Sequence, residues 1–159
     1  MSAPTNPITP AGYAALKARY DLLLGTERPA IVEIVSWAAG NGDRSENGDY
    51  IYGRKRMREI DRELAHLARR LKASRIIDPL EQSDRQRAFF GARVTLADED
   101  DVQKCITLVG DDEQDAGVGR IGWSSPLARA LKGASVGDIR SVQLPAGAKE
   151  WEVVEIAYV

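Results

Sequence analysis

Residues 42–50 read GDRSENGDY and lie between two amphipathic helical patterns, so they mark the turn of a helical hairpin. Three carboxylates, Asp43, Glu46 and Asp49, recur at three-residue spacing around this turn. The end of a hairpin is far from any core, so folding gives acids no reason to gather there. The stretch therefore predicts an anionic point on a helical stalk, suited to a metal ion or another cation.

A structural interpretation of the same acids stays open. If Asp43 is the N-cap of the second helix, Glu46 falls at the third helical position, as in a capping box, and acids suit the positive end of a helix. Asp49 is not explained in this way. Two acids are too few for Mg²⁺, which takes an octahedral set of oxygens. Metal chemistry at the tip would therefore complete a site on another macromolecule, such as a two-metal phosphoryl-transfer centre.

Apolar residues at three- and four-residue steps predict the two helices of the stalk. Thr9-Pro10 gives the first helix an N-cap and a proline at its first position. Pro29 should kink or restart that helix, and Asp78-Pro79 should end the second. The predicted seam consists of Tyr13, Leu16, Tyr20 and Leu23, then Ile31, Ile34, Val35 and Ala38, and on the second helix Met57, Ile60, Leu64, Leu67 and Leu71.

The second helix is basic. Residues 50–75 hold nine Lys and Arg against three Asp and Glu, an excess that attracts polyanions. The sequence shows no regular acidic partners one turn along, which favours a phosphate-contacting face over a merely solvated one. The basic residues nearest the tip are Arg54, Lys55, Arg56 and Arg58.

Beyond a polar segment at 80–86 the apolar period changes to two, which predicts strands. Ser125-Pro126 should cap a short helix. The fold class is therefore α+β: an N-terminal antiparallel coiled-coil hairpin, residues 1–79, followed by a small, mostly antiparallel β domain with one short helix, residues 80–159. The expected strands are 89–96, 104–109, 118–124, 140–144 and 150–158.

Composition excludes several classes of protein. The 159 residues contain no apolar run long enough to span a bilayer and no signal-peptide pattern. Cys105 is the single cysteine, which fits a reducing compartment, so a cytoplasmic location is expected. The chain lacks a Walker loop, a dinucleotide fingerprint and a nucleophile elbow, so it is not expected to be an enzyme by itself.

Together these motifs resemble the bacterial Gre transcript cleavage factors, closest to the GreB type, over nearly the whole chain. The nonapeptide at 42–50 is the most specific match. Further matches are TPAGYAALK at 9–17, ERP at 27–29, WAA at 37–39, KRMREIDR at 55–62, FFGA at 89–92, SPLARAL at 125–131, VGD at 136–138 and PAG at 145–147.

The resemblance implies a transcription elongation factor whose FKBP-like C-terminal domain docks on RNA polymerase at the mouth of the secondary channel. The hairpin would pass down the channel, and the polymerase would cleave backtracked RNA near its 3′ end. Asp43 and Glu46 would organise a Mg²⁺ ion shared with the polymerase active centre, with no cofactor bound by the chain alone. A monomer without a membrane partner is expected.

The resemblance also assigns roles to other residues. Ser45, Asn47, Asp49 and Tyr50 would support the tip; Arg54, Lys55, Arg56 and Arg58 would hold the extruded RNA; and Trp123, Ser124, Ser125 and Pro126 would dock on polymerase. Two positions depart from the family pattern. Ser124 stands where an acidic docking residue is expected, and Gly48 replaces the usual alanine.

Three other functions stay open. The first is a channel binder that modulates or inhibits polymerase without cleavage. The second is a coiled-coil adaptor whose tip acids serve only as caps. The third is a peptidyl-prolyl isomerase or chaperone, which would need an aromatic proline pocket built from Phe89, Phe90, Trp123, Trp151 and Tyr158.

Overall fold

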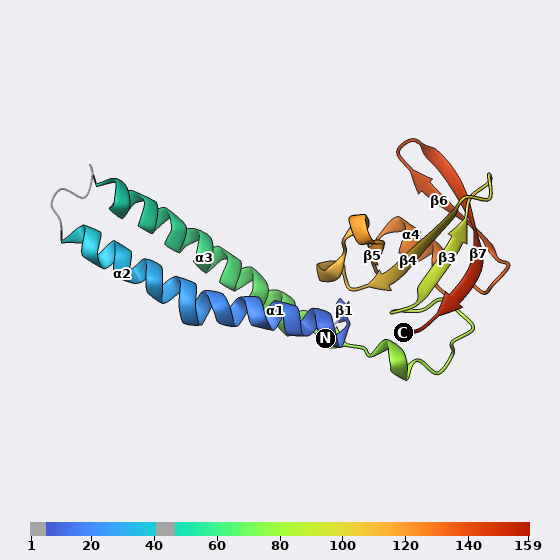
Figure 1. Ribbon diagram of the computed structural model, residues 1–159, viewed down its shortest axis with the longest axis horizontal. Coiled ribbons are helices and arrows are strands. Elements are labelled where there is room, and N and C mark those ends of the chain that lie inside the picture. The colour runs from blue at the N-terminus through green and yellow to red at the C-terminus, as the bar shows by residue number, and fades with distance from the viewer. Residues whose placement is uncertain (1–5, 41–46) are drawn as a thin grey trace. The chain divides into compact units, whose positions relative to one another are not determined.

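The structure is a computed structural model that describes residues 6–40 and 47–159. The chain forms two compact units (Figure 1): a helical unit, Ala14–Ala73, and a sheet unit that joins Met1–Tyr13 to Ser74–Val159. The helical unit is thus inserted into the sheet unit. This division differs from the boundary expected between residues 79 and 80, because the first strand of the chain folds with residues that follow the hairpin.

The helical unit contains the predicted hairpin. Its elements are α1 (Pro10–Leu22), a π-helical segment (Leu23–Glu27), α2 (Arg28–Ala39) and α3 (Gly48–Ala73). The buried seam holds Leu23, Ile31, Ile60 and Leu67, with Leu16, Tyr20, Met57 and Leu64 packed against them. These residues are all among those predicted, which confirms the helical period.

The break expected at Pro29 takes the form of a π-helix followed by a restart. Proline has no N–H to donate to the carbonyl four residues earlier, so the regular ladder cannot run through it. The Arg28 N–H instead bonds to the carbonyl of Leu23, five residues back, and regular α-helix begins at Arg28.

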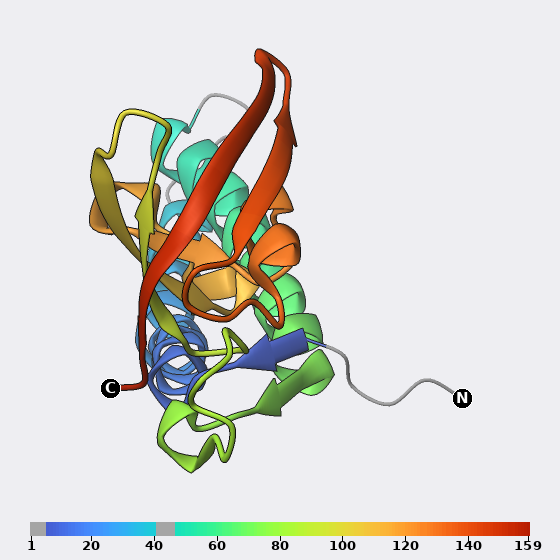
Figure 2. The same ribbon diagram turned by 90° about the vertical axis from the view of Figure 1, so that its right-hand side faces the viewer.

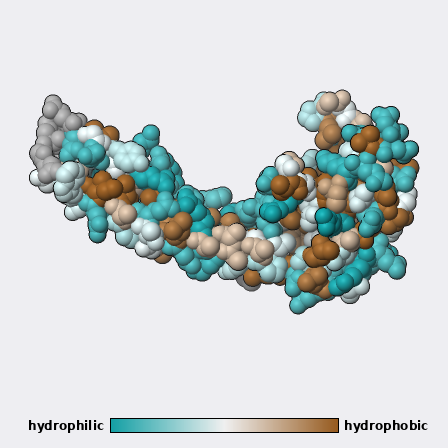
Figure 3. All heavy atoms as spheres, in the orientation of Figure 1, coloured by the Kyte–Doolittle hydropathy of each residue, from teal (hydrophilic) through white to brown (hydrophobic). Residues whose placement is uncertain are grey.

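One seam assignment is wrong. Ile34 is 43% exposed, and the inward positions of α2 are taken by Ile31 and Ala38. Ile34 is one turn from both Ala30 and Ala38 but lies off the line of contact with α3. Figure 3 shows that hydrophobic residues do reach the surface over α2.

The sheet unit contains a curled five-stranded sheet in the order β5-β4-β3-β7-β6 (Figure 2). Neighbouring strands are antiparallel except for the β4–β5 pair, which is parallel. The strands are β3 (Arg93–Ala97), β4 (Gln103–Val109), β5 (Arg120–Gly122), β6 (Ile139–Leu144) and β7 (Gly147–Ala157). The short helix α4 (Pro126–Leu131) contributes Leu131 to a core that also contains Leu96 and Val153, all fully buried. The predicted α+β class is confirmed.

Two further short strands pair in parallel, β1 (Asn6–Ile8) and β2 (Ser74–Ile76). The expectation that the second helix runs to Asp78-Pro79 is therefore wrong. It ends at Ala73, because the next three residues bond to β1, whose Ile8 is fully buried. Asp78 begins a separate 3₁₀ turn, in which its carboxylate accepts the N–H of Leu80 at 2.9 Å.

The strand expected from residue 89 begins four residues later. Residues 89–92 form a turn in which Ala92 N–H bonds to the carbonyl of Phe89 at 3.0 Å. Gly91 has φ +86°, and a β-carbon there would lie 2.5 Å from Pro79 Cγ, so glycine is required by both conformation and space.

None of the helices in the described ranges combines the length and apolarity needed to cross a bilayer.

Candidate functional site

The tip segment, which contains the predicted acidic residues, connects the end of α2 to the start of α3. Asp43, Ser45 and Glu46 lie outside the described residues. The structure does describe the residues that flank the segment: α2 ends at Ala39, with Gly40 as its C-cap, and α3 begins at Gly48. The acids are thus carried between two helix ends that pack against each other.

Asn47 joins these two helix ends. Its Oδ1 accepts the N–H of Tyr50 at 3.2 Å, and its Nδ2 donates to the carbonyl of Ala38 at 2.7 Å. The first N–H groups and last carbonyls of a helix lack partners within the helix. One side chain therefore serves an unpaired donor of α3 and an unpaired acceptor of α2, which ties the base of the tip together.

The cap of α3 is consequently Asn47. The interpretation in which Asp43 caps the second helix, with Glu46 at its third position, is wrong for the helix observed, because α3 begins at Gly48 and the third position is Tyr50. Asp49 is exposed in the first turn, where a carboxylate suits the helix dipole.

The helices approach closely just below the tip. Gly53 of α3 is buried against Val35 of α2, and a β-carbon on Gly53 would lie 2.6 Å from Val35 Cγ2. Ordinary carbon contacts are about 3.5–4.0 Å. Glycine therefore lets α3 lie against α2 at this level, while no atom of the described residues lies within 4 Å of a β-carbon placed on Gly48.

The four basic residues expected to bind RNA differ in their surroundings. Arg54 donates to the Tyr50 hydroxyl at 3.1 Å and lies 5.8 Å from the centre of its ring, so these two side chains hold each other. Lys55 and Arg58 are exposed, and no carboxylate of residues 6–40 or 47–159 pairs with either.

Arg56 belongs instead to a network of charges on one side of the hairpin. It pairs with Glu27 at 3.1 Å and with Glu59 at 3.4 Å, so the expectation that this helix lacks acidic partners is wrong for Arg56. Arg19 joins Glu27 to Glu63, each at 2.8 Å. The hydrogen bond from Arg19 lowers the pKa of Glu63 below its ordinary value. We call these five residues the flank network.

The expected docking residues form a corner of the sheet unit. Ser125 caps α4 by accepting the N–H of Ala128 at 3.3 Å, and Pro126 takes the first helical position. Trp123 packs edge-to-face on Phe90, with ring centres 5.7 Å apart, and Lys132 lies over its ring at 5.4 Å. Ser124 is exposed between these anchored residues.

A carboxylate from another part of the chain reaches this corner. Asp111 Oδ1 accepts the N–H of Ser124 at 2.9 Å. Gly122 permits the approach, because a β-carbon there would lie 2.9 Å from the same oxygen. Asp111 is not among the docking residues expected from the sequence. Nothing in the sequence indicates that residues 111 and 124 meet, since their contact depends on the parallel β4–β5 pair.

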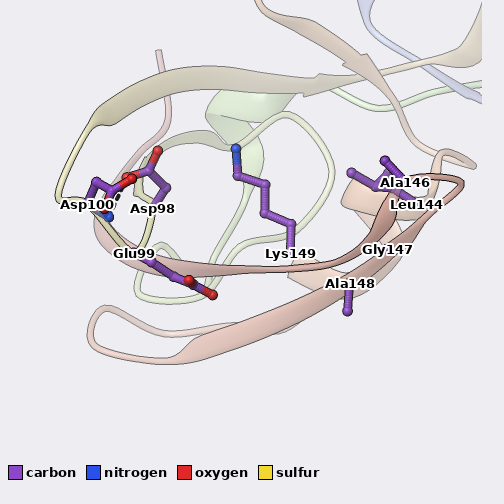
Figure 4. A pocket seen from close by; sticks show the side chains of 8 residues that line it. All are labelled: Asp98, Glu99, Asp100, Leu144, Ala146, Gly147, Ala148 and Lys149. Carbon is purple, nitrogen blue, oxygen red and sulfur yellow. Dashed lines mark hydrogen bonds between the residues drawn. The ribbon is translucent and has the colours of Figure 1, made fainter.

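A cleft of about 310 Å³ lies between the β3–β4 and β6–β7 turns (Figure 4). Asp98, Glu99 and Asp100 line one side, and Lys149 extends toward the space between the turns. Asp98 is occupied by its own turn, accepting the N–H groups of Asp100 and Val102 at 2.9 Å. No aromatic side chain lines this cleft.

Three of the five aromatic residues proposed for a proline pocket are buried instead, and Phe89 and Trp123 are half-buried. Phe90, Trp151 and Tyr158 are each 8% exposed or less. The Tyr158 hydroxyl donates to the carbonyl of Arg87 at 2.6 Å and accepts the N–H of Phe89 at 2.8 Å, while burial raises its pKa. The isomerase alternative therefore has little support in the structure.

Within residues 6–40 and 47–159 there is no group of three or more His, Cys, Asp or Glu side chains that could hold a metal ion. The carboxylates proposed for Mg²⁺ are Asp43 and Glu46, outside this part of the chain.

Comparison with known proteins covers both units. The family models described as "Transcription elongation factor, N-terminal" and "Transcription elongation factor, GreA/GreB, C-term" match residues 6–76 and 82–158. The transcription elongation factor GreB of Neisseria meningitidis serogroup B is 48% identical over 100% of this chain and 98% of its own. The transcription elongation factor GreA of Ruegeria pomeroyi is 40% identical over 96% of this chain and 97% of its own. Among solved structures, GreA factor homolog 1 (Gfh1) of Thermus thermophilus is 22% identical, with a TM-score of 0.44, over 96% of this chain and 98% of that chain.

Proposed function

The chain belongs to the GreA/GreB family of transcription elongation factors and is of the GreB type, and on that premise we propose that it enters the secondary channel of RNA polymerase and stimulates cleavage of backtracked RNA. The catalyst is the polymerase. The chain supplies carboxylates at the tip of a hairpin, a group that holds RNA, and a docking surface on the sheet unit.

The contacts of Asn47 are the observation that best supports the proposed role of the tip. Its two hydrogen bonds join the ends of α2 and α3 on either side of the acid-bearing segment. Carboxylates that act in another protein's active centre must arrive with little freedom, because small errors in position cost large factors in rate. A clamp at the base of the tip reduces that freedom.

Asp43 and Glu46 would provide oxygen ligands to a Mg²⁺ ion held mainly by the polymerase. When bound there, the ion activates a water molecule and stabilises charge on the phosphate being cleaved. With Asn47 as the cap of α3, Asp43 and Glu46 are not needed to begin that helix and are available for this role.

Lys55 and Arg58 are the basic residues best placed to hold extruded RNA. They are exposed and have no carboxylate partner within the described part of the chain, so phosphate contacts would cost no existing ion pair. Arg56 would have to leave Glu27 and Glu59 first. We therefore propose Lys55 and Arg58 as direct contacts and Arg56 as a residue that stiffens the hairpin.

Docking on polymerase would use the corner formed by Trp123, Ser124, Ser125 and Pro126. Asp111, which accepts the N–H of Ser124, would supply the carboxylate expected just before Ser125. A negative charge at the corner would attract a basic group of the polymerase, although the acid comes from a different position in the chain.

The test is RNA cleavage in a purified backtracked elongation complex with Mg²⁺. The wild-type protein should accelerate release of 3′ fragments, while Asp43→Asn combined with Glu46→Gln should still bind polymerase but lose the acceleration. The melting temperature of the double variant should be unchanged, because neither acid caps α3. Binding without cleavage by the wild type would support the alternative of a factor that modulates polymerase. Full activity in the double variant would refute the role of the acids.

A further inference from the structure

Two aromatic side chains near the tip are largely exposed. Trp37 of α2 is 63% exposed and Tyr52 of α3 is 62% exposed. Aromatic rings contribute most when buried, so such exposure on a narrow hairpin indicates a surface kept for a partner. Ile34, which the seam excludes, is also 43% exposed.

Tyr52 and Ile34 share one flank of the hairpin. The ion pair between Arg56 and Glu27 crosses from α3 to the end of the π-helical segment, just before α2, on the side of the flank network. Tyr52 is one turn from Arg56, and Ile34 is two turns from Glu27, so both project toward that same side.

Tyr52 and Ile34 also lie at the same level along the hairpin. Gly53 contacts Val35, and Tyr52 and Ile34 are the preceding neighbours of these two residues. Trp37 follows Ile34 by nearly one helical turn, toward the tip. The result is a small apolar surface, which we call the tip platform: Ile34, Trp37 and Tyr52.

The charges beside the tip platform indicate what covers it. Lys55 lies one turn from Tyr52 and, in the described ranges, has no acidic partner. Residues 50–75 carry nine basic residues against three acidic ones. Flat aromatic rings next to cations match a single-stranded nucleic acid, whose bases stack while its phosphates meet the positive charges.

We propose that the tip platform stacks on a base of single-stranded RNA, with Trp37 and Tyr52 as the stacking residues. This rests on the proposed function in one respect, that extruded RNA reaches the tip. It extends that function because the hairpin would bind bases as well as phosphates. Purines, which stack more strongly, would be held better than pyrimidines.

The experiment uses the full-length protein and two short RNAs without polymerase. One is an adenosine-rich oligoribonucleotide, and the other has the same length and phosphates but abasic positions. Trp37→Leu and Tyr52→Leu should each weaken binding of the first RNA roughly tenfold and leave binding of the abasic RNA unchanged. The salt dependence of binding should not change, because the phosphate contacts remain.

Two control variants make the result specific. Ile51→Ala removes an exposed apolar side chain, 52% accessible, that neighbours Tyr52 but projects about 100° around the helix from it, and should bind both RNAs as the wild type does. Trp37→Phe keeps a ring and should retain most of the affinity.

Several results would overturn the proposal. One is an equal loss for both RNAs in the leucine variants, and another is no difference between the two RNAs for the wild type, including binding of neither. Weakened polymerase binding with unchanged RNA affinity would assign the tip platform to a protein contact instead. A protein that accelerates cleavage but fails to distinguish the two RNAs would refute the platform alone, whereas RNA stacking without cleavage would refute only the proposed function.

Discussion

Replacing Asn47 with alanine removes both hydrogen bonds that join α2 and α3 at the base of the tip. The acceptor Oδ1 caps the Tyr50 N–H, and the donor Nδ2 satisfies the carbonyl of Ala38. Asn47→Asp separates the two roles, because a carboxylate keeps the acceptor but cannot donate to a carbonyl.

The expected losses follow from these contacts. Removing an N-cap costs about 1 kcal/mol of stability, and losing the bond to Ala38, whose side chain is fully buried, costs about 1 kcal/mol more. Asn47→Ala should thus lower the free energy of unfolding of the helical unit by about 2 kcal/mol. Asn47→Asp should lose about half of that, with some repulsion between its carboxylate and the Ala38 carbonyl.

The assay is urea unfolding of the full-length chain followed by circular dichroism, with RNA cleavage measured on the same preparations. Asp49→Asn is the matched control, since Asp49 is exposed in the first turn of α3 and should lose at most about 0.5 kcal/mol of dipole stabilisation. Cleavage should fall in Asn47→Ala although every tip acid remains. If Asn47→Ala unfolds at the same urea concentration as Asp49→Asn, the clamp described for Asn47 is wrong.

Gly53→Ala should lower the free energy of unfolding by about 1–2 kcal/mol despite alanine's better helix propensity, because the added β-carbon meets Val35, whose side chain is stiff. Gly25→Ala is the control and should cause no such loss, because no atom of the described residues lies within 4 Å of a β-carbon there. Equal urea midpoints for the two variants would contradict the close approach of Gly53 to Val35. Acidification below about pH 4.3, the ordinary pKa of a glutamate, should destabilise the helical unit. The pKa of Glu63 is lower in the folded than in the unfolded chain, so its ionised carboxylate stabilises the fold above the unfolded pKa and this contribution is lost as the pH falls through the folded pKa. Glu63→Gln should flatten that part of a melting curve against pH, and an unchanged curve would exclude Glu63. Asp111→Asn keeps its acceptor and should melt normally, but should weaken polymerase binding roughly fivefold in a salt-sensitive way; unchanged affinity would remove Asp111 from the docking surface.

The hairpin was predictable because its signals are local. Apolar spacing located the seam, and Pro29 located the restart of the first helix, since both act within a few residues. The same reasoning placed Ile34 in the seam, because a spacing rule does not distinguish the centre of a contact from its edge. The exposed Ile34 is now part of the tip platform.

Features that depend on distant contacts were not predictable. The β1–β2 pair joins three-residue strands from opposite sides of the hairpin, too short to show alternation, so the end of α3 was placed too late. Asp111 reaches Ser124 only when β4 and β5 are paired. The two hydrogen bonds of Asn47 can be recognised only when the ends of both α2 and α3 are in place.

The insertion of the helical unit into the sheet unit has a consequence for the order of folding. β1 is made first, but its partner β2 follows only after α3 is complete, with Asn6 pairing with Ser74. Closing an unfolded loop of that length costs about 4 kcal/mol of chain entropy. A hairpin that has already formed brings its own two ends together, so β1 and β2 meet across a short gap. The stalk that would carry carboxylates into a polymerase would then also be the connector that closes the β1–β2 ladder.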